Sequence, residues 1–182
     1  MLRPVRRIVT GHDAQGRSIV LSDALSPHVL ENPVRPGRGL TDLWRTDAVP
    51  ASNAGDEDGA DRTVELNPPE RGTVFRFFQI NPASGEADMT AEEREERYAA
   101  AFTQMGAGHD RVDTRRHPGM HRTRTIDYIV LLSGEVTLIL DEGEVDMKPM
   151  DVVVQRGTNH AWENRGTEPA VLAGILIDAE AL

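Results

Sequence analysis

Polar side chains alternate along one segment in the second half of the chain. His121, Thr123, Thr125 and Asp127 are each separated from the next by one residue, and aliphatic residues continue the same spacing as far as Leu131. Because the side chains of a strand alternate between its two faces, all of these would project to one side. An imidazole, two hydroxyls and a carboxylate in a row would either line a polar cavity or face solvent at a frayed strand end.

A second group of candidate residues follows the turn at Gly157. His160, Trp162 and Asn164 share one strand face. The indole of Trp162 could stack on a planar ligand, or it could fill the interior of a barrel. The sequence contains no cysteine. This excludes thiolate metal sites, iron–sulfur clusters and a cysteine nucleophile, so any metal would need histidine, carboxylate or water as ligands.

The elements that would position these residues are short strands with turn signals between them. In the second half we predict strands at 123–132, 135–141, 144–148, 151–155, 159–164 and 170–177. Short strands at even spacing, with no helix between them, favour an antiparallel barrel or sandwich over a parallel sheet.

The first half is predicted to hold fewer elements, namely strands at 5–11, 16–21, 41–46 and 74–80 and one helix at 90–105. The helix begins with a capping box of Thr90 and Glu93. We expect its apolar stripe, from Tyr98 to Met105, to pack against a sheet or a partner subunit rather than to form a site.

The remaining segments of the first half read as loops. Residues 23–40 carry three prolines, and 49–72 are polar and acidic, so we predict a mobile surface loop for the latter. The acidic residues of that loop lack the spacing of a calcium site. Arg76 could bind an anionic substrate, but we interpret it as an exposed side chain.

The segment that begins at His121 resembles the first conserved motif of the cupin superfamily, in particular that of small single-domain bacterial cupins. Members of that family have a histidine, a second histidine two residues later, a carboxylate four residues after that and a glycine seven residues further on. At those positions this chain has His121, Thr123, Asp127 and Gly134. The family's second motif, a glycine, a histidine and an asparagine, is matched by Gly157, His160 and Asn164.

The resemblance implies an all-β fold: a cupin-like antiparallel β-barrel, also called a double-stranded β-helix or jelly roll, with one additional helix. Residues 117–178 would form the barrel core and carry both motifs. Residues 1–106 would add N-terminal strands, the acidic loop and the helix to one domain spanning 1–182.

In cupins the two motifs hold a divalent metal. Because Thr123 stands at the second histidine position, the resemblance implies three ligands here, His121, Asp127 and His160, for Fe, Mn, Zn or Ni. Aspartate is shorter than the usual glutamate, so Asp127 could instead support a ligand or act as a general base. His117 could supply another imidazole, although Pro118 and Gly119 would bend the chain after it.

The expected function is that of a small-molecule enzyme with a mononuclear metal. Asp127, Thr123 and Thr125 would be catalytic, with the threonines orienting substrate or water, and Trp162 and Thr125 would contact substrate. The resemblance allows oxygenation, isomerisation, decarboxylation or dehydration. A metal-free acid–base enzyme using His160 or Asp127, and a non-catalytic small-ligand-binding module, are the alternatives.

The composition of the chain excludes some classes of binding partner. The chain has 30 acidic and 20 basic residues and a formal charge of −10, with no basic stripe, which argues against nucleic acid. No apolar run approaches the roughly 18 to 20 residues that a membrane span needs. We therefore expect a cytoplasmic protein that binds a small molecule, and a homodimer formed through the 90–105 helix.

Overall fold

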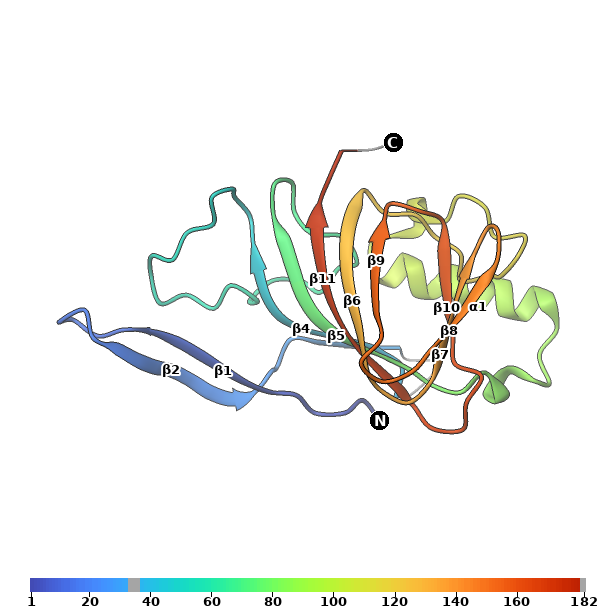
Figure 1. Cartoon of the computed structure of the whole chain (residues 1–182), viewed down its shortest axis with the longest axis horizontal. Helices are drawn as coiled ribbons and strands as arrows, with labels where there is room; N and C mark the ends of the chain where they lie inside the picture. Colours follow the sequence, from blue (N-terminus) through green and yellow to red (C-terminus); the bar gives the residue numbers. More distant parts are fainter. Residues whose placement is uncertain (33–36, 181–182) are drawn as a thin grey trace.

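The computed structural model describes residues 1–32 and 37–180, and two antiparallel sheets form its centre (Figure 1). The larger sheet comprises, in spatial order, β3 (Val29–Glu31), β4 (Gly39–Thr46), β5 (Thr73–Ile80), β11 (Ala170–Asp178), β6 (Thr125–Ser133) and β9 (Val152–Arg156). The smaller sheet comprises β10 (His160–Glu163), β7 (Val136–Leu140) and β8 (Glu144–Met147). The predicted all-β barrel-like architecture with one added helix is confirmed.

The core lies between the two sheets. Strands of both contribute to one buried cluster, which consists of Ile80, Ile129, Leu131, Val136, Met147, Ala170 and Leu172. An isolated backbone bridge between Pro82 and Asn164 connects segments outside the strands. The Asn164 side chain also donates hydrogen bonds to the carbonyls of Ile80 and Glu168, at 2.9 and 2.8 Å. Asn164 therefore fixes the chain around β10 rather than serving the cavity.

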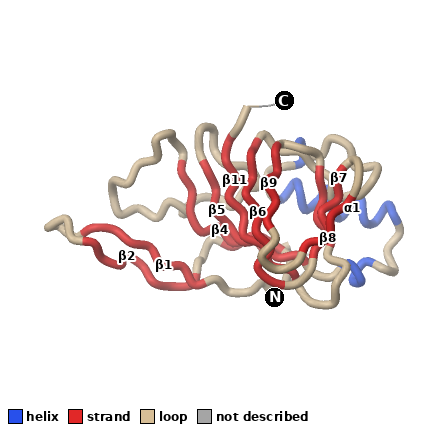
Figure 2. The backbone as a smooth tube through the Cα atoms, viewed as in Figure 1, coloured by secondary structure: helices blue, strands red, loops and turns tan. Residues whose placement is uncertain are grey.

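A hairpin of β1 (Arg6–His12) and β2 (Ser18–Leu25) forms a separate two-stranded sheet that projects from the rest of the molecule (Figure 2). Its strands were predicted at 5–11 and 16–21, so β2 extends further than expected. The sequence interpretation of 23–40 as loop missed β3, a three-residue strand that pairs with β4 at the sheet edge. Pairing partners, rather than local pattern, produce such a short strand.

The helix α1 (Ala91–Gln104) begins as predicted. The Thr90 side chain accepts from the Glu93 backbone, and the Glu93 carboxylate accepts from the Thr90 backbone. Two short 3-10 helices, Ala83–Glu86 and Gly108–Asp110, flank α1 in the chain. Within the described residues, no helix is long and apolar enough to cross a membrane.

The polar segment 49–72 is anchored at several points, so its prediction as a mobile surface loop was wrong in part. Asp58 pairs with Arg7 and contacts Nε2 of His28 at 3.0 Å. Near its end, the Leu66 backbone donates to the carbonyl of Met105 at 2.9 Å, and the Leu66 side chain packs against α1. The segment therefore supports the helix.

Candidate functional site

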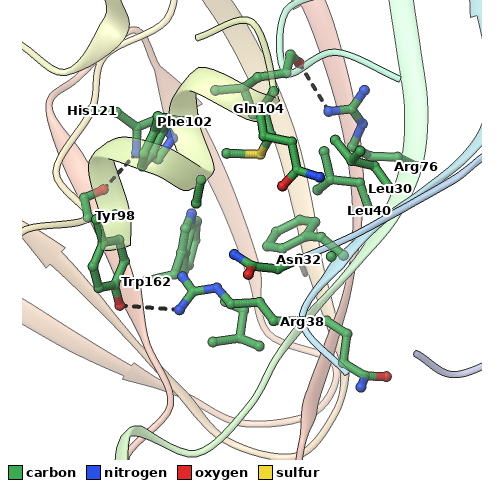
Figure 3. Close-up of a pocket in the computed structure, with 18 of the residues that line it drawn as sticks. Leu30, Asn32, Arg38, Leu40, Arg76, Tyr98, Phe102, Gln104, His121 and Trp162 are labelled. Carbon is green, nitrogen blue, oxygen red and sulfur yellow. Dashed lines mark hydrogen bonds between the residues drawn. The ribbon is translucent and has the colours of Figure 1, made fainter. Parts of the chain in front are cut away.

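A cavity of about 150 Å³ lies between α1 and the strands β4, β5, β6 and β10. Its lining is mainly apolar and aromatic, and Figure 3 shows how side chains from separate elements converge on it. The lining includes Leu30, Leu40, Leu66, Phe78, Ile80, Ile129, Trp162 and Leu176, together with the polar residues described below. Of the residues predicted to form a site, the pocket brings together His121, Asp127, His160 and Trp162.

The stripe of α1 lines this pocket, which corrects the expectation that it would not form a site. Tyr98, Ala101, Phe102 and Met105 all contribute to the lining. The Phe102 ring lies 4.8 Å from the His121 ring, centroid to centroid. The amphipathic pattern predicted a buried face correctly but could not say that a cavity would remain beneath it.

His121 and His160 form a buried pair at one end of the cavity. Each backbone N–H donates to the other residue's carbonyl at 2.9 Å, as an isolated antiparallel bridge. This bridge holds the two rings with centroids 4.3 Å apart. The predicted alternation is confirmed in the burial of the side chains, which alternate between buried and exposed from His121 to Asp127, although β6 itself begins only at Thr125.

Both imidazoles have a defined tautomer. Nδ1 of His121 lies 2.9 Å from the carbonyl of Gly119, and Nδ1 of His160 lies 2.9 Å from the carbonyl of Thr158. Since a carbonyl can only accept, each Nδ1 carries the proton, and each Nε2 keeps a lone pair in the neutral ring. Burial lowers the pKa of His121 to about 3, with a further contribution from His160, and that of His160 to about 4. Both rings are therefore neutral at neutral pH.

Asp127 lies in β6 and is 5% exposed. Burial raises the pKa of its carboxyl group to about 6, against the smaller opposing effects of Thr125 and Arg76. Its Oδ1 atom accepts no hydrogen bond from any described residue. A buried carboxylate with a free oxygen in a cavity wall costs stability, which is typical of a group kept for binding or chemistry.

Arg76 is fully buried, so its interpretation as an exposed side chain was wrong. Its Nε lies 2.9 Å from Oδ1 of Asp42, and its remaining nitrogens donate to the carbonyls of Glu65 and Leu66 at 2.5 and 3.1 Å. Asp42 comes from the neighbouring β4, opposite Arg76 in the register. The presence of two oppositely charged residues in adjacent strands was the sequence signal that could have revealed this pair.

Thr123 and Thr125 are buried but do not belong to the pocket lining. Their hydroxyl oxygens lie 2.6 Å apart and bond to each other. Trp162 does line the pocket, with its ring 5.7 Å from that of His160 and 6.3 Å from that of Phe78. The catalytic and substrate-contacting roles predicted for the threonines stay predictions, whereas the pocket location of Trp162 fits a ligand contact.

The His117 ring packs edge-on against the Tyr98 ring, with centroids 5.4 Å apart, and does not belong to the pocket lining. Its Nδ1 accepts the backbone N–H of Gly119 at 2.9 Å, and its Nε2 lies 3.8 Å from Glu163. The lone pair that a metal would need is therefore already used by the backbone. Sequence analysis named His117 as a possible additional ligand, and this geometry does not favour that role.

The donor atoms of the pocket fit a metal only in part. The Nε2 lone pairs of His121 and His160 are ligands that Zn, Fe, Mn or Ni accept. However, the described part of the chain gathers no group of three or more imidazole and carboxylate side chains that could hold an ion. The three-ligand site with Asp127 therefore stays a prediction, and no chemical step is derived through a metal.

Two facing antiparallel sheets, with a mainly apolar pocket and a buried histidine pair beside it, define a barrel-type fold with a candidate site. Comparison with known proteins gives the family. The cupin domain model matches residues 108–178. Phomopsin biosynthesis cluster protein D of Diaporthe leptostromiformis is 32% identical over 171 residues, which cover 90% of this chain and 72% of that protein. The chain belongs to the cupin family.

Two further proteins are similar to this chain. The cupin-domain-containing oxidoreductase fogC of Aspergillus ruber is 26% identical, and the match covers 97% of this chain and 74% of that protein. The cupin domain of Cnp3 from Schizosaccharomyces pombe is a similar solved structure, with 10% identity, a TM-score of 0.46 and coverage of 95% of this chain and 87% of that one. These sequence relatives are fungal, so the resemblance to bacterial cupins in particular finds no support in them.

Proposed function

We propose that this cupin is an enzyme that binds a largely apolar small molecule in the cavity and transfers a proton on it. The observation that carries the proposal is the placement of Asp127 and two neutral, orientation-fixed imidazoles in the wall of one apolar pocket. Isomerisation and dehydration, two of the reaction classes that the family resemblance allows, both need such a transfer. The small-molecule partner and a cytoplasmic location remain part of this proposal.

The pKa values of the pocket residues distinguish the proposed general base from the residues that would orient the substrate. A general base works best when its pKa lies near the working pH. Asp127, at about 6, meets this condition, whereas His121 and His160, at about 3 and 4, are weak bases. Asp127 would therefore accept the proton, and each Nε2 would accept a hydrogen bond from a substrate hydroxyl or N–H and so orient it.

A second candidate is metal-dependent oxidoreduction. It is favoured by the two available Nε2 lone pairs and by relatives whose names describe oxidoreductases. His121 and His160 would hold the ion, which would supply the electron-transfer or Lewis-acid chemistry that imidazole and carboxylate lack.

Exchange of substrate hydrogen with solvent tests the proposed proton transfer. A panel of small cyclic ketones and enols is incubated with the enzyme in D₂O, and deuterium uptake is followed by mass spectrometry. We expect uptake that Asp127→Asn abolishes while Trp162→Ala weakens substrate binding. Uptake that survives Asp127→Asn would contradict the assigned base.

Elemental analysis of untagged protein separates the two candidates. One equivalent of metal, lost in both His121→Ala and His160→Ala, would support metal-dependent oxidoreduction. Metal that stays sub-stoichiometric after reconstitution would exclude it, since a site with so few ligands cannot spare one.

A further inference from the structure

Three arginines line the pocket within the described part of the chain, and they differ in their partners. Arg76 is neutralised by Asp42, whereas Arg38 and Arg97 have no described carboxylate within ion-pair distance. Elsewhere in the structure, arginines form ion pairs with aspartate or glutamate at positions 6, 7, 17, 111, 115, 116 and 165.

The position of Arg38 is fixed by the helix. Its Nη1 donates to the Tyr98 hydroxyl at 3.2 Å, and its guanidinium carbon lies 5.0 Å from the centre of the Tyr98 ring (Figure 3). Stacking and one hydrogen bond use only part of a group that has five N–H donors. The remaining donors are held in place before any ligand arrives, which lowers the entropy cost of binding.

Burial distinguishes two ends of the cavity. His121, His160 and Asp127 are buried, whereas Arg38 and Arg97 are half-buried and therefore lie toward the mouth. Gln104, also in the lining, is exposed on the same helix as Arg97. The more exposed part of the lining is thus cationic and polar, whereas the buried part is mainly apolar and holds Asp127, the two histidines and the neutralised Arg76.

We propose that Arg38 and Arg97 bind the carboxylate of an organic-acid substrate at the pocket mouth. A planar carboxylate matches the fork geometry of guanidinium donors. The apolar body of the acid would extend inward toward Phe78 and Trp162. A cavity of about 150 Å³ is comparable to one that holds benzene, so the body is about one six-membered ring. This inference rests on the proposed function, because it names the substrate class of the same pocket.

Paired probes test the charge requirement. Binding of 3-phenylpropanoate and of its amide, 3-phenylpropanamide, is measured by calorimetry with the full chain. We expect the acid to bind about tenfold more tightly, the effect of one charge-assisted contact. Arg38→Gln and Arg97→Gln should each reduce this preference. Arg94→Gln is the matched control, because Arg94 lies one turn earlier on α1 and does not line the pocket.

The outcomes distinguish this inference from the proposed function. Equal binding of acid and amide, both weakened by Trp162→Ala, would overturn the carboxylate site and leave the pocket intact. Acid preference that survives the Arg38→Gln/Arg97→Gln double variant would also overturn it. Failure of both probes to bind would overturn the assignment to single-ring acids.

Discussion

Replacing Asp127 with asparagine is expected to stabilise the protein while removing its proposed base. The folded structure raises the carboxyl pKa from 3.8 to about 6. The folded state therefore binds this proton more tightly than the unfolded state, and stability falls as the pH rises between these two values. The pKa difference of 6 − 3.8, or 2.2 pKa units, means that above pH 6 the buried carboxylate lowers the free energy of unfolding by about 3 kcal/mol.

Asparagine has nearly the same shape and no charge at any pH, so it avoids this cost. Relative to wild type, we expect the free energy of unfolding of Asp127→Asn to rise by about 2 kcal/mol between pH 4 and pH 8, since part of the cost is already present at pH 4. Urea unfolding at both pH values, with m-values compared to confirm two-state behaviour, gives this difference directly. Asp56→Asn, in the exposed loop, controls for the loss of one negative charge.

A pH-independent stability difference between Asp127→Asn and wild type would refute the reasoning. It would mean that an interaction offsets the burial of the ionised carboxylate. A destabilised variant at pH 8 would refute it more strongly, because the carboxylate would then be a net stabilising group. The expected result, greater stability with loss of proton transfer, would mark Asp127 as a residue kept for function at a cost to the fold.

Three other predictions concern stability. Asp42→Asn should lower the free energy of unfolding by about 3 to 5 kcal/mol, because Arg76 is left buried and unpaired, and Asp42→Leu/Arg76→Met should recover most of it; a loss below 1 kcal/mol in urea would contradict this. Lowering the pH from 6.5 to 5 should reduce the free energy of unfolding by about 2 kcal/mol for each of His121 and His160, because these histidines take up protons in the unfolded state but stay neutral in the folded state. His160→Gln should remove about half of this pH dependence. Gly134→Ala should lower the melting temperature more than Gly143→Ala: both have positive φ, but only at Gly134 would a Cβ meet backbone, 2.7 Å from the Cα of Ala170.

The second half of the fold could be predicted closely from the sequence. The strand predicted at 151–155 is Val152–Arg156, and the strand predicted at 170–177 is Ala170–Asp178. Alternation and turn glycines determine such strands locally. The helix was predictable for the same reason, because its capping box is a local motif.

The pocket was only partly predictable. His121, Asp127, His160 and Trp162 were identified from spacing and do line it. Which face of β5 is buried could not be predicted, because both faces carry large apolar residues. Phe75 and Phe77 lie on one face, and Val74 and Phe78 lie on the other. Only pairing with β4, which brings Asp42 opposite Arg76, decides which face is buried.

The central position of β11 has a consequence for how this protein forms. Ala170–Asp178 lies between β5 and β6, and in the larger sheet those two strands are joined only through it. During synthesis, β5 and β6 must leave the ribosome long before the strand that joins them, and each then has one edge unpaired. The sheet, and with it the pocket, can close only once residue 178 has emerged. We therefore expect nascent chains ending before β11 to be the species most exposed to aggregation and most dependent on chaperones.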